Sequence, residues 1–219
     1  YAKLFRNEVI ISSLMNTIII AVIASIAATL LGTLAAIGIN SMRKVPKAIV
    51  MNITNMPIVN PEIVTGVSLM LLFVFFAARM NLEFGFVTLV IAHITFDVPY
   101  VILNVMPKFR QMDPNLFEAA QDLGCSPFTA LRKVILPEIM PGVVSGFLMS
   151  FTFSLDDFVI SYFTSGTTQT LPIYIYSMTR KRISPEINAL SAIMFCVTIA
   201  LVVLAFCLSR PRKSLRKQG

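Results

Sequence analysis

The stretch PKFRQMDPNLFEAAQDLGCSPFTALRKVILP, residues 107–137, decides the fold. Its first half predicts a short helix. Asp113 is a good N-cap, Pro114 suits the first helical position, and Gly124 suits the turn that ends the helix. Such a helix is too short to cross a bilayer, so this part of the chain is expected to lie outside the membrane.

The second half of the stretch repeats the pattern. Ser126 followed by Pro127 predicts another helix start. Pro137 is expected to stop this second helix, because proline interrupts the helical hydrogen-bond ladder. Together the two halves predict a compact helix–turn–helix whose exposed faces carry charged side chains, namely Glu118, Asp122, Arg132 and Lys133.

The remainder of the chain has the composition of an integral membrane protein. Of 219 residues, 56% are hydrophobic and 13% are charged, and the mean hydropathy is +0.80. Soluble domains carry about 25% charged residues, so this composition rules out a disordered chain and strongly disfavours a soluble enzyme. Three scattered cysteines and one histidine, His93, are too few for a disulfide scaffold or a zinc centre.

Five continuous apolar stretches predict an all-α, polytopic transmembrane bundle rather than a barrel. They are 13–39, 48–78, 85–106, 138–160 and 188–208. In the first, Ala28, Gly32 and Ala36 repeat every four residues, which suits close helix packing. The second is longer than a span needs, and Pro57 and Pro61 are expected to kink or break it.

Positive charge predicts the orientation of the spans. The segments 40–47, 107–137 and 209–219 hold 12 of the 18 Lys and Arg residues, so they are expected on the cytoplasmic side. This places the N-terminus outside and the C-terminus inside. Because nothing before residue 13 could carry the N-terminus across, we expect a further N-terminal span, making six. The net charge of +7 needs no nucleic acid to explain it.

Polar groups inside the expected spans are candidates for a transport pathway. In the third span, Asp97 and Tyr100 form one helical stripe with His93 and Asn104. The stripe faces either a water-filled path or a hydrogen-bonded packing network. The second span contributes a further carboxylate, Glu62.

A second group of polar residues ends the fourth span. Asp156 and Asp157 follow the aromatic residues Phe151 and Phe153. Carboxylates beside aromatic faces would attract a cation. The alternative is a structural role, with the acids capping a helix or pairing with a basic residue in 180–182.

The 107–137 stretch resembles the EAA loop of ABC-importer permeases. The matching residues are Glu118, Ala119, Ala120, Gly124, Leu136 and Pro137. The resemblance implies that 1–219 is one type I permease domain, and that 107–137 docks on a separate ATPase with Glu118 as a polar anchor. The chain has no P-loop of its own, so it is not expected to be an enzyme. ATP and Mg²⁺ would be bound by the ATPase, and the chain itself would carry no cofactor.

Further segments resemble the permeases of spermidine/putrescine importers. They are HITF (93–96), SFTFSLDD (150–157), LPIYIYSM (171–178) and SPEINAL (184–190). The resemblance implies a bacterial inner-membrane protein that assembles with a second, B-type permease, two ATPase subunits and an external binding protein. Ferric iron, thiamine or aminoethylphosphonate are alternative cargoes. An ion-coupled carrier using Glu62, Asp97 and Asp156 is a further alternative, but it would leave the EAA loop without a role.

Overall fold

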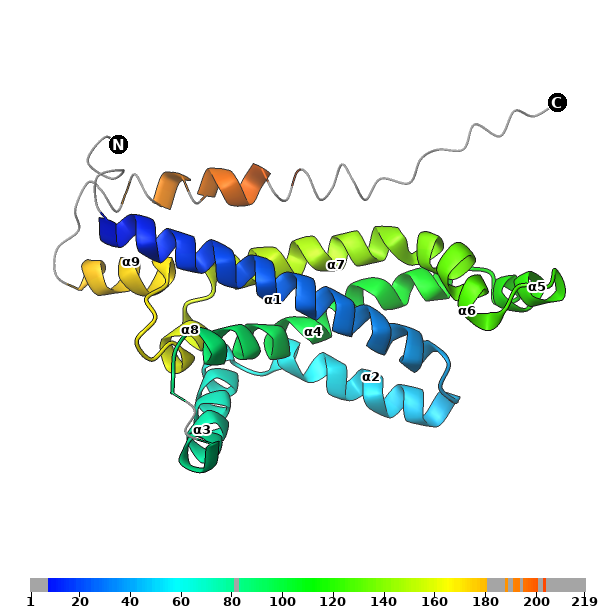
Figure 1. The fold of residues 1–219 in the computed structure, drawn as a ribbon, viewed down its shortest axis with the longest axis horizontal. Helices are drawn as coiled ribbons and strands as arrows, with labels where there is room; N and C mark the ends of the chain where they lie inside the picture. The colour runs from blue at the N-terminus through cyan, green and yellow to red at the C-terminus, as the bar shows by residue number, and fades with distance from the viewer. Residues whose placement is uncertain are drawn as a thin grey trace.

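Three long helices lie side by side in the computed structural model (Figure 1). They are α1 (Glu8–Asn40), α4 (Phe86–Gln111) and α7 (Leu136–Asp156). α1 and α4 run in the same direction and α7 runs back between the same two ends. The structure describes residues 8–80, 83–180, 188, 191–193, 195–200 and 203, and within them all regular secondary structure is helical.

Small residues bring α1 close to α4, as their spacing predicts. Ala28 and Ala36 are fully buried. At Gly32, an added Cβ would lie 2.7 Å from the Cβ of Val101 and 3.2 Å from the carbonyl oxygen of Val98. Glycine is therefore required there by close approach of the two helices. The outer face of α1 carries exposed apolar side chains such as Leu30 and Leu34, which suits contact with lipid.

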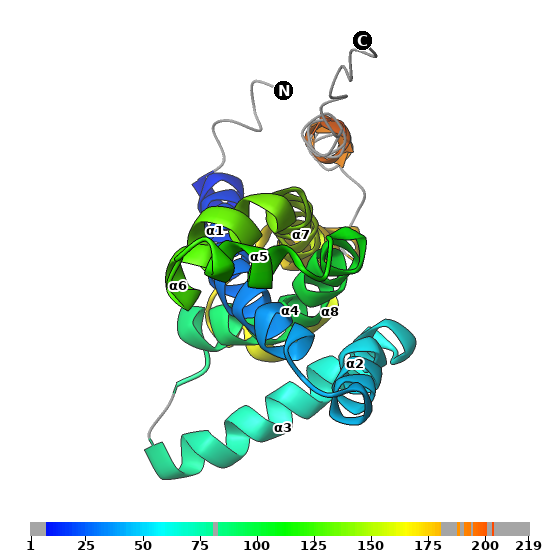
Figure 2. The ribbon, with the colours of Figure 1, turned by 90° about the vertical axis from the view of Figure 1, so that its right-hand side faces the viewer.

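The second expected span is broken into two helices, as predicted. α2 (Lys44–Val59) is followed by Asn60, whose backbone is extended with φ −75° and ψ 135°. α3 (Glu62–Met80) begins after Pro61. Pro57 remains inside α2. The expectation of one span over 48–78 is wrong in extent. Of the helices in this stretch, only Glu62–Arg79 is long and apolar enough to cross a membrane. Seen along the bundle, α3 projects away from it (Figure 2).

The predicted helix–turn–helix is present, but its second helix does not stop at Pro137. After α5 (Leu116–Asp122) and α6 (Pro127–Ala130) come a π-helical turn (Leu131–Ile135) and then α7. The backbone N–H of Leu136 bonds the carbonyl of Leu131. Pro137 follows this wider turn directly. Proline has no backbone N–H, and in a regular α-helix its ring would clash with the carbonyl of the preceding turn, so a wider turn suits it. The helical path therefore continues from Pro127 to Asp156.

The far end of α7 also differs from the expected span. The helix ends at Asp156 instead of residue 160, and α8 (Val159–Thr164) and α9 (Leu171–Thr179) follow. Four helices of the described chain are long and apolar enough to span a membrane: Glu8–Asn40, Glu62–Arg79, Phe86–Gln111 and Pro127–Asp156. The fifth expected span, 188–208, lies partly outside the described residues; Ser191–Ala200 belongs to an apolar helix there.

Candidate functional sites at the two ends of α7

The segment around α5 presents a mixed polar and apolar surface. Glu118 and Ala119 are exposed, whereas Ala120 is buried against the neighbouring helices. Leu123 is 87% exposed and Phe128 is 72% exposed. Two large apolar side chains this exposed next to a carboxylate are typical of a surface that another protein covers.

Local backbone geometry fixes the shape of this surface. Gly124 has φ +86°, and the N–H of Cys125 bonds the carbonyl of Ala120 across the turn, so the predicted glycine stop is confirmed. Ser126 caps α6 by accepting from the N–H of Thr129, also as predicted. Asp113 instead caps the turn before α5, accepting from the N–H of Asn115.

An apolar cavity of about 650 Å³ separates this surface from the ends of α1 and α4. Its walls include Ile37 of α1, Phe109 of α4, Phe117 of α5, Phe128 of α6 and Ile135 of the π-helical turn. Of the remaining residues expected in the docking motif, Leu136 is half-buried and Pro137 is exposed, both at the start of α7. The segment is joined to the bundle by α7 and by apolar contacts, because Phe117 and Leu131 pack against core residues of α1, α4 and α7.

At the opposite end of α7, three predicted carboxylates meet. Glu62, Asp156 and Asp157 line one cleft of about 220 Å³. Each is placed by a helix boundary, because Glu62 begins α3, Asp156 ends α7 and Asp157 precedes α8. The aromatic residues Phe96, Phe153 and Phe158 line the same cleft. Within the described residues, neither Glu62 nor Asp156 forms an ion pair, so both negative charges are open to a cation.

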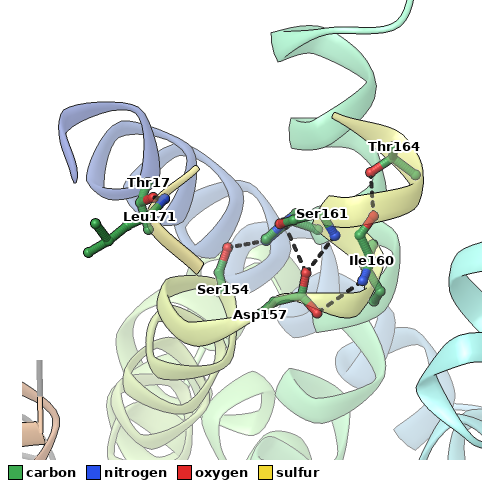
Figure 3. Close-up of polar contacts among 8 residues, drawn as sticks. Thr17, Ser154, Asp157, Ile160, Ser161, Thr164 and Leu171 are labelled. Carbon is green, nitrogen blue, oxygen red and sulfur yellow. Dashed lines mark hydrogen bonds and ion pairs between the residues drawn. The ribbon is translucent and has the colours of Figure 1, made fainter. Parts of the chain in front are cut away.

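Asp157 differs from Glu62 and Asp156 because both of its carboxylate oxygens already accept hydrogen bonds from the backbone of α8 (Figure 3). Its side chain is only 5% exposed. One oxygen accepts from the N–H of Ile160 at 3.3 Å, and the other accepts from the N–H of Ser161 at 2.8 Å. The second oxygen also lies 3.6 Å from Nε2 of His93. These contacts fit the predicted helix-capping alternative for this residue.

His93 connects three helices by hydrogen bonds next to the cleft. It belongs to α4; its Nδ1 lies 2.6 Å from the hydroxyl of Ser154 in α7, and its Nε2 lies 3.0 Å from that of Ser161 in α8. The His93 side chain is 3% exposed. Further along the same stripe, Asn104 accepts a hydrogen bond from Ser145 of α7. The stripe therefore faces α7, as the packing-network alternative expects.

The other predicted pathway residues lie outside the cleft lining. Asp97 is fully buried. One of its oxygens accepts from Ser150 at 2.8 Å, and the other has no hydrogen-bond partner among the described residues. The Tyr100 ring packs edge-on against Phe153, with the ring centroids 4.7 Å apart, and Tyr100 is not among the residues that line the cleft. Phe151 stacks on Phe147 and is not among the residues that line the cleft.

The sequence reasoning missed two aromatic residues of the cleft, Phe96 and Phe158. Phe96 lies four residues before Tyr100, so it shares a helix face with a residue already singled out. That spacing could have identified it. Phe158 directly follows the acidic pair, but it lines the cleft only because the helix ends at Asp156. The break in α7 was not predicted, so no sequence signal placed Phe158 there.

Comparison with known proteins places the chain in a family. Residues 28–211 match the family described as binding-protein-dependent transport system inner membrane component. The chain is 40% identical over 211 residues to the spermidine/putrescine transport system permease protein PotC of Haemophilus influenzae, covering 96% of this chain and 80% of that protein.

A second relative and a solved structure agree with that match. The putrescine transport system permease protein PotI of Escherichia coli is 38% identical over 199 residues, covering 89% of this chain and 70% of that one. The fold matches that of the inward-facing MetNI methionine ABC transporter with a TM-score of 0.74 at 14% identity, covering 91% of this chain and 94% of that one. The chain therefore belongs to the binding-protein-dependent transport system inner membrane components, as the EAA-loop resemblance implied.

Proposed function

We propose that this chain is the permease subunit of an ATP-driven importer whose cargo is spermidine or putrescine. The observation that carries the choice of cargo is the cleft in which Glu62 and Asp156 lie beside aromatic rings, with no ion pair to either carboxylate in the described part of the chain. The similarity to PotC and PotI supports the same cargo.

The chemistry of the cleft suits an alkylammonium group. A primary ammonium carries three donors and one positive charge, which a carboxylate binds through charge-assisted hydrogen bonds. The faces of Phe96, Phe153 and Phe158 add cation–π attraction and contact for the methylene chain. An acidic cleft repels the phosphonate of aminoethylphosphonate, so that cargo fits less well. We assign cargo contact to Glu62 and Asp156, and the positioning of α8 to Asp157.

The opposite end of α7 suits docking to a separate ATPase. Glu118 supplies an exposed charge, and Leu123 and Phe128 supply exposed apolar contacts. The helical path Pro127–Asp156 contains 30 residues, or about 45 Å, and leads from this surface to the cleft. Closure of the ATPase on ATP would move α6, and α7 would carry that movement to Asp156, alternately exposing the cleft to each side of the membrane.

The complete machine proposed here has several partners. They are a second permease of the B type, two copies of the ATPase that bind ATP and Mg²⁺, and an external binding protein that delivers the cargo. The chain lies in the bacterial inner membrane with its C-terminus in the cytoplasm. The surface that carries α5 faces the cytoplasm in this arrangement, which agrees with the basic residues of 107–137.

The proposal is tested by uptake of labelled spermidine into proteoliposomes. They contain the full-length subunit, its partner permease and the ATPase, with the binding protein outside. ATP-dependent uptake that persists after ion gradients are collapsed is expected, and uptake that needs a gradient would favour the ion-coupled carrier. ATPase activity stimulated by loaded binding protein, without polyamine uptake, would refute the cargo.

Two kinds of variant test the residue assignments. Asp156→Asn and Glu62→Gln are expected to weaken uptake without disturbing assembly, while Glu83→Gln, an exposed carboxylate outside the cleft lining, should behave like the parent. Glu118→Lys is expected to uncouple or release the ATPase. Normal transport by Glu118→Lys would contradict the docking assignment.

A further inference from the structure

The apolar cavity between the surface around α5 and the ends of α1 and α4 has one polar corner. Asn40, the last residue of α1, and Ser41, which follows it, are among the residues that line the cavity. The ammonium group of Lys47, in the first turn of α2, donates to the side-chain oxygen of Asn40 at 2.9 Å and to its carbonyl oxygen at 3.5 Å. One positive charge therefore lies at the polar corner of a mainly apolar space.

No carboxylate neutralises this charge in the described part of the chain. The Lys47 side chain is half-buried and forms no ion pair there. The carboxylate of Asp113, where the acidic residues of the docking stretch begin, accepts instead from the N–H of Asn115. The segments 40–47 and 107–112, which lead into and out of the cavity walls, contain no acidic residue and five basic ones, namely Arg43, Lys44, Lys47, Lys108 and Arg110. This end of the bundle therefore favours an anionic group next to the cavity.

The cavity lies at the level where the spans leave the bilayer. α1 exposes large apolar side chains as far as Leu34 and ends at Asn40. α4 is apolar up to Met106 and then continues with Lys108 and Arg110. In the orientation proposed above, basic residues at this level mark the headgroup region of the cytoplasmic leaflet, where anionic lipids are concentrated.

We propose that this cavity binds an anionic phospholipid of the cytoplasmic leaflet, with one acyl chain inside the cavity and the phosphate group on Lys47. The volume of about 650 Å³ lies within the range of about 300–1,000 Å³ typical of ligand pockets. Phe109, Phe117 and Ile135 supply apolar contacts for the chain. Basic pockets at the cytoplasmic ends of membrane helices are suited to lipid headgroups. The inference rests on the proposed orientation and is independent of the cargo.

A lipid chain in this cavity would join the two parts of the protein between which movement must pass. The walls come from α1 and α4 on one side, and from α5, α6 and the π-helical turn on the other. An occupied space gives its lining van der Waals contacts that an empty one lacks, so the chain would stiffen this connection. We therefore expect loaded binding protein to stimulate the ATPase more strongly in membranes that contain phosphatidylglycerol than in pure phosphatidylcholine. Lys47→Gln should remove most of that difference.

Photolabelling tests the site directly. The purified complex of both permeases and the ATPase is incubated with phosphatidylglycerol that carries a photoreactive diazirine on one acyl chain. After irradiation, the labelled residues are located by peptide mass spectrometry. Labels are expected on cavity residues such as Phe109, Phe117 and Leu131. Phosphatidylcholine with the same photoreactive chain should label them more weakly, because its headgroup carries no net negative charge.

Two substitutions separate the contribution of the headgroup from that of the chain. Lys47→Gln should raise the phosphatidylglycerol concentration for half-maximal labelling about fivefold. Lys44→Gln is the matched control, because it removes one positive charge from the same helical turn, but Lys44 is exposed and does not line the cavity. Ser41→Phe adds a ring at an exposed position of the cavity wall. It should reduce labelling of the cavity while labelling of the outer face of α1 stays unchanged, which shows that the complex is intact.

Three results would overturn the proposal. Labels confined to outward-facing side chains such as Leu30 and Leu34 would mean that lipid surrounds the protein without entering the cavity. Equal labelling of the cavity by both lipids would remove the role of the anionic headgroup. Equal effects of Lys47→Gln and Lys44→Gln would reduce that role to general attraction by positive charge. Labelling is measured without cargo, so these results do not depend on whether the complex imports spermidine.

Discussion

Replacing Asp157 by two different residues separates its structural role from cargo binding. The side chain introduced by Asp157→Asn keeps an oxygen that accepts a backbone N–H, and asparagine caps helices about as well as aspartate. Asp157→Asn therefore removes the charge and keeps one of the two accepting oxygens, which is enough for the shorter hydrogen bond, from the N–H of Ser161. Asp157→Ala removes both. The N–H groups of Ile160 and Ser161 would then lose their acceptor in residues that are each 1% exposed.

The expected cost of Asp157→Ala follows from those two hydrogen bonds. Loss of a cap destabilises a protein by about 0.5–2 kcal/mol, and the burial of both amides places this case near about 2 kcal/mol. For a chain of this length, that lowers the thermal midpoint by about 4–8 °C. His93 also loses its charged neighbour, which lies 3.6 Å away. Asp157→Asn should cost less stability than Asp157→Ala, because it keeps one of the two acceptors, and it should stay close to the parent in spermidine affinity.

Heating followed by fluorescence-detected size-exclusion chromatography measures the midpoint of the assembled complex. Equilibrium dialysis of labelled spermidine measures affinity on the same samples. Asp156→Asn is the matched control for stability, because it removes a neighbouring carboxylate for which no ion pair occurs among the described residues. By the assignment above, this variant should bind spermidine more weakly at an unchanged thermal midpoint. A stable Asp157→Asn complex that binds spermidine tenfold more weakly would refute the reasoning, since Asp157 would then contact the cargo directly.

Three further predictions concern the frame and the docking surface. Gly32→Ala should destabilise the complex by about 1–3 kcal/mol, measured as a lower thermal midpoint, and Val101→Ala in the same chain should restore part of the loss. Gly124→Ala should cost about 1–2 kcal/mol at φ +86° and reduce stimulation of the ATPase by loaded binding protein. Thr17→Val should cost about 1–3 kcal/mol, also seen in the midpoint, because the buried N–H of Leu171 donates to the Thr17 hydroxyl at 2.8 Å (Figure 3).

Much of the architecture could be predicted because its signals are local. Continuous apolar stretches identify helices that cross a bilayer, and the Ala28-Gly32-Ala36 spacing identifies the face that packs. Gly124 and Ser126 mark helix ends through backbone geometry that few other residues provide. Each of these features depends on a few neighbouring residues, so sequence alone contains enough information.

The remaining features depend on contacts between distant segments. Pro137 is a helix breaker by local rules, but it follows a π-helical turn in which Leu136 bonds the carbonyl of Leu131, and the helical path continues past it to Asp156. The meeting of Glu62 with Asp156 requires the positions of two helix breaks that lie about ninety residues apart in the sequence. Asp97 has the sequence context of a pathway residue, yet packing of α4 against α7 buries it completely.

The sparse packing of α3 has a consequence for how fast the protein is degraded in the cell. α3 packs mainly on α8, and only 17% of its apolar window is buried within the chain. The rest of its surface must be covered by lipid or by another subunit. A subunit synthesised without its partner subunits would have α3 held within the chain mainly by its contacts with α8. Membrane proteases recognise such loosely packed helices. Pulse-chase labelling should therefore show a shorter half-life for the orphan chain than for the chain co-expressed with its partner permease.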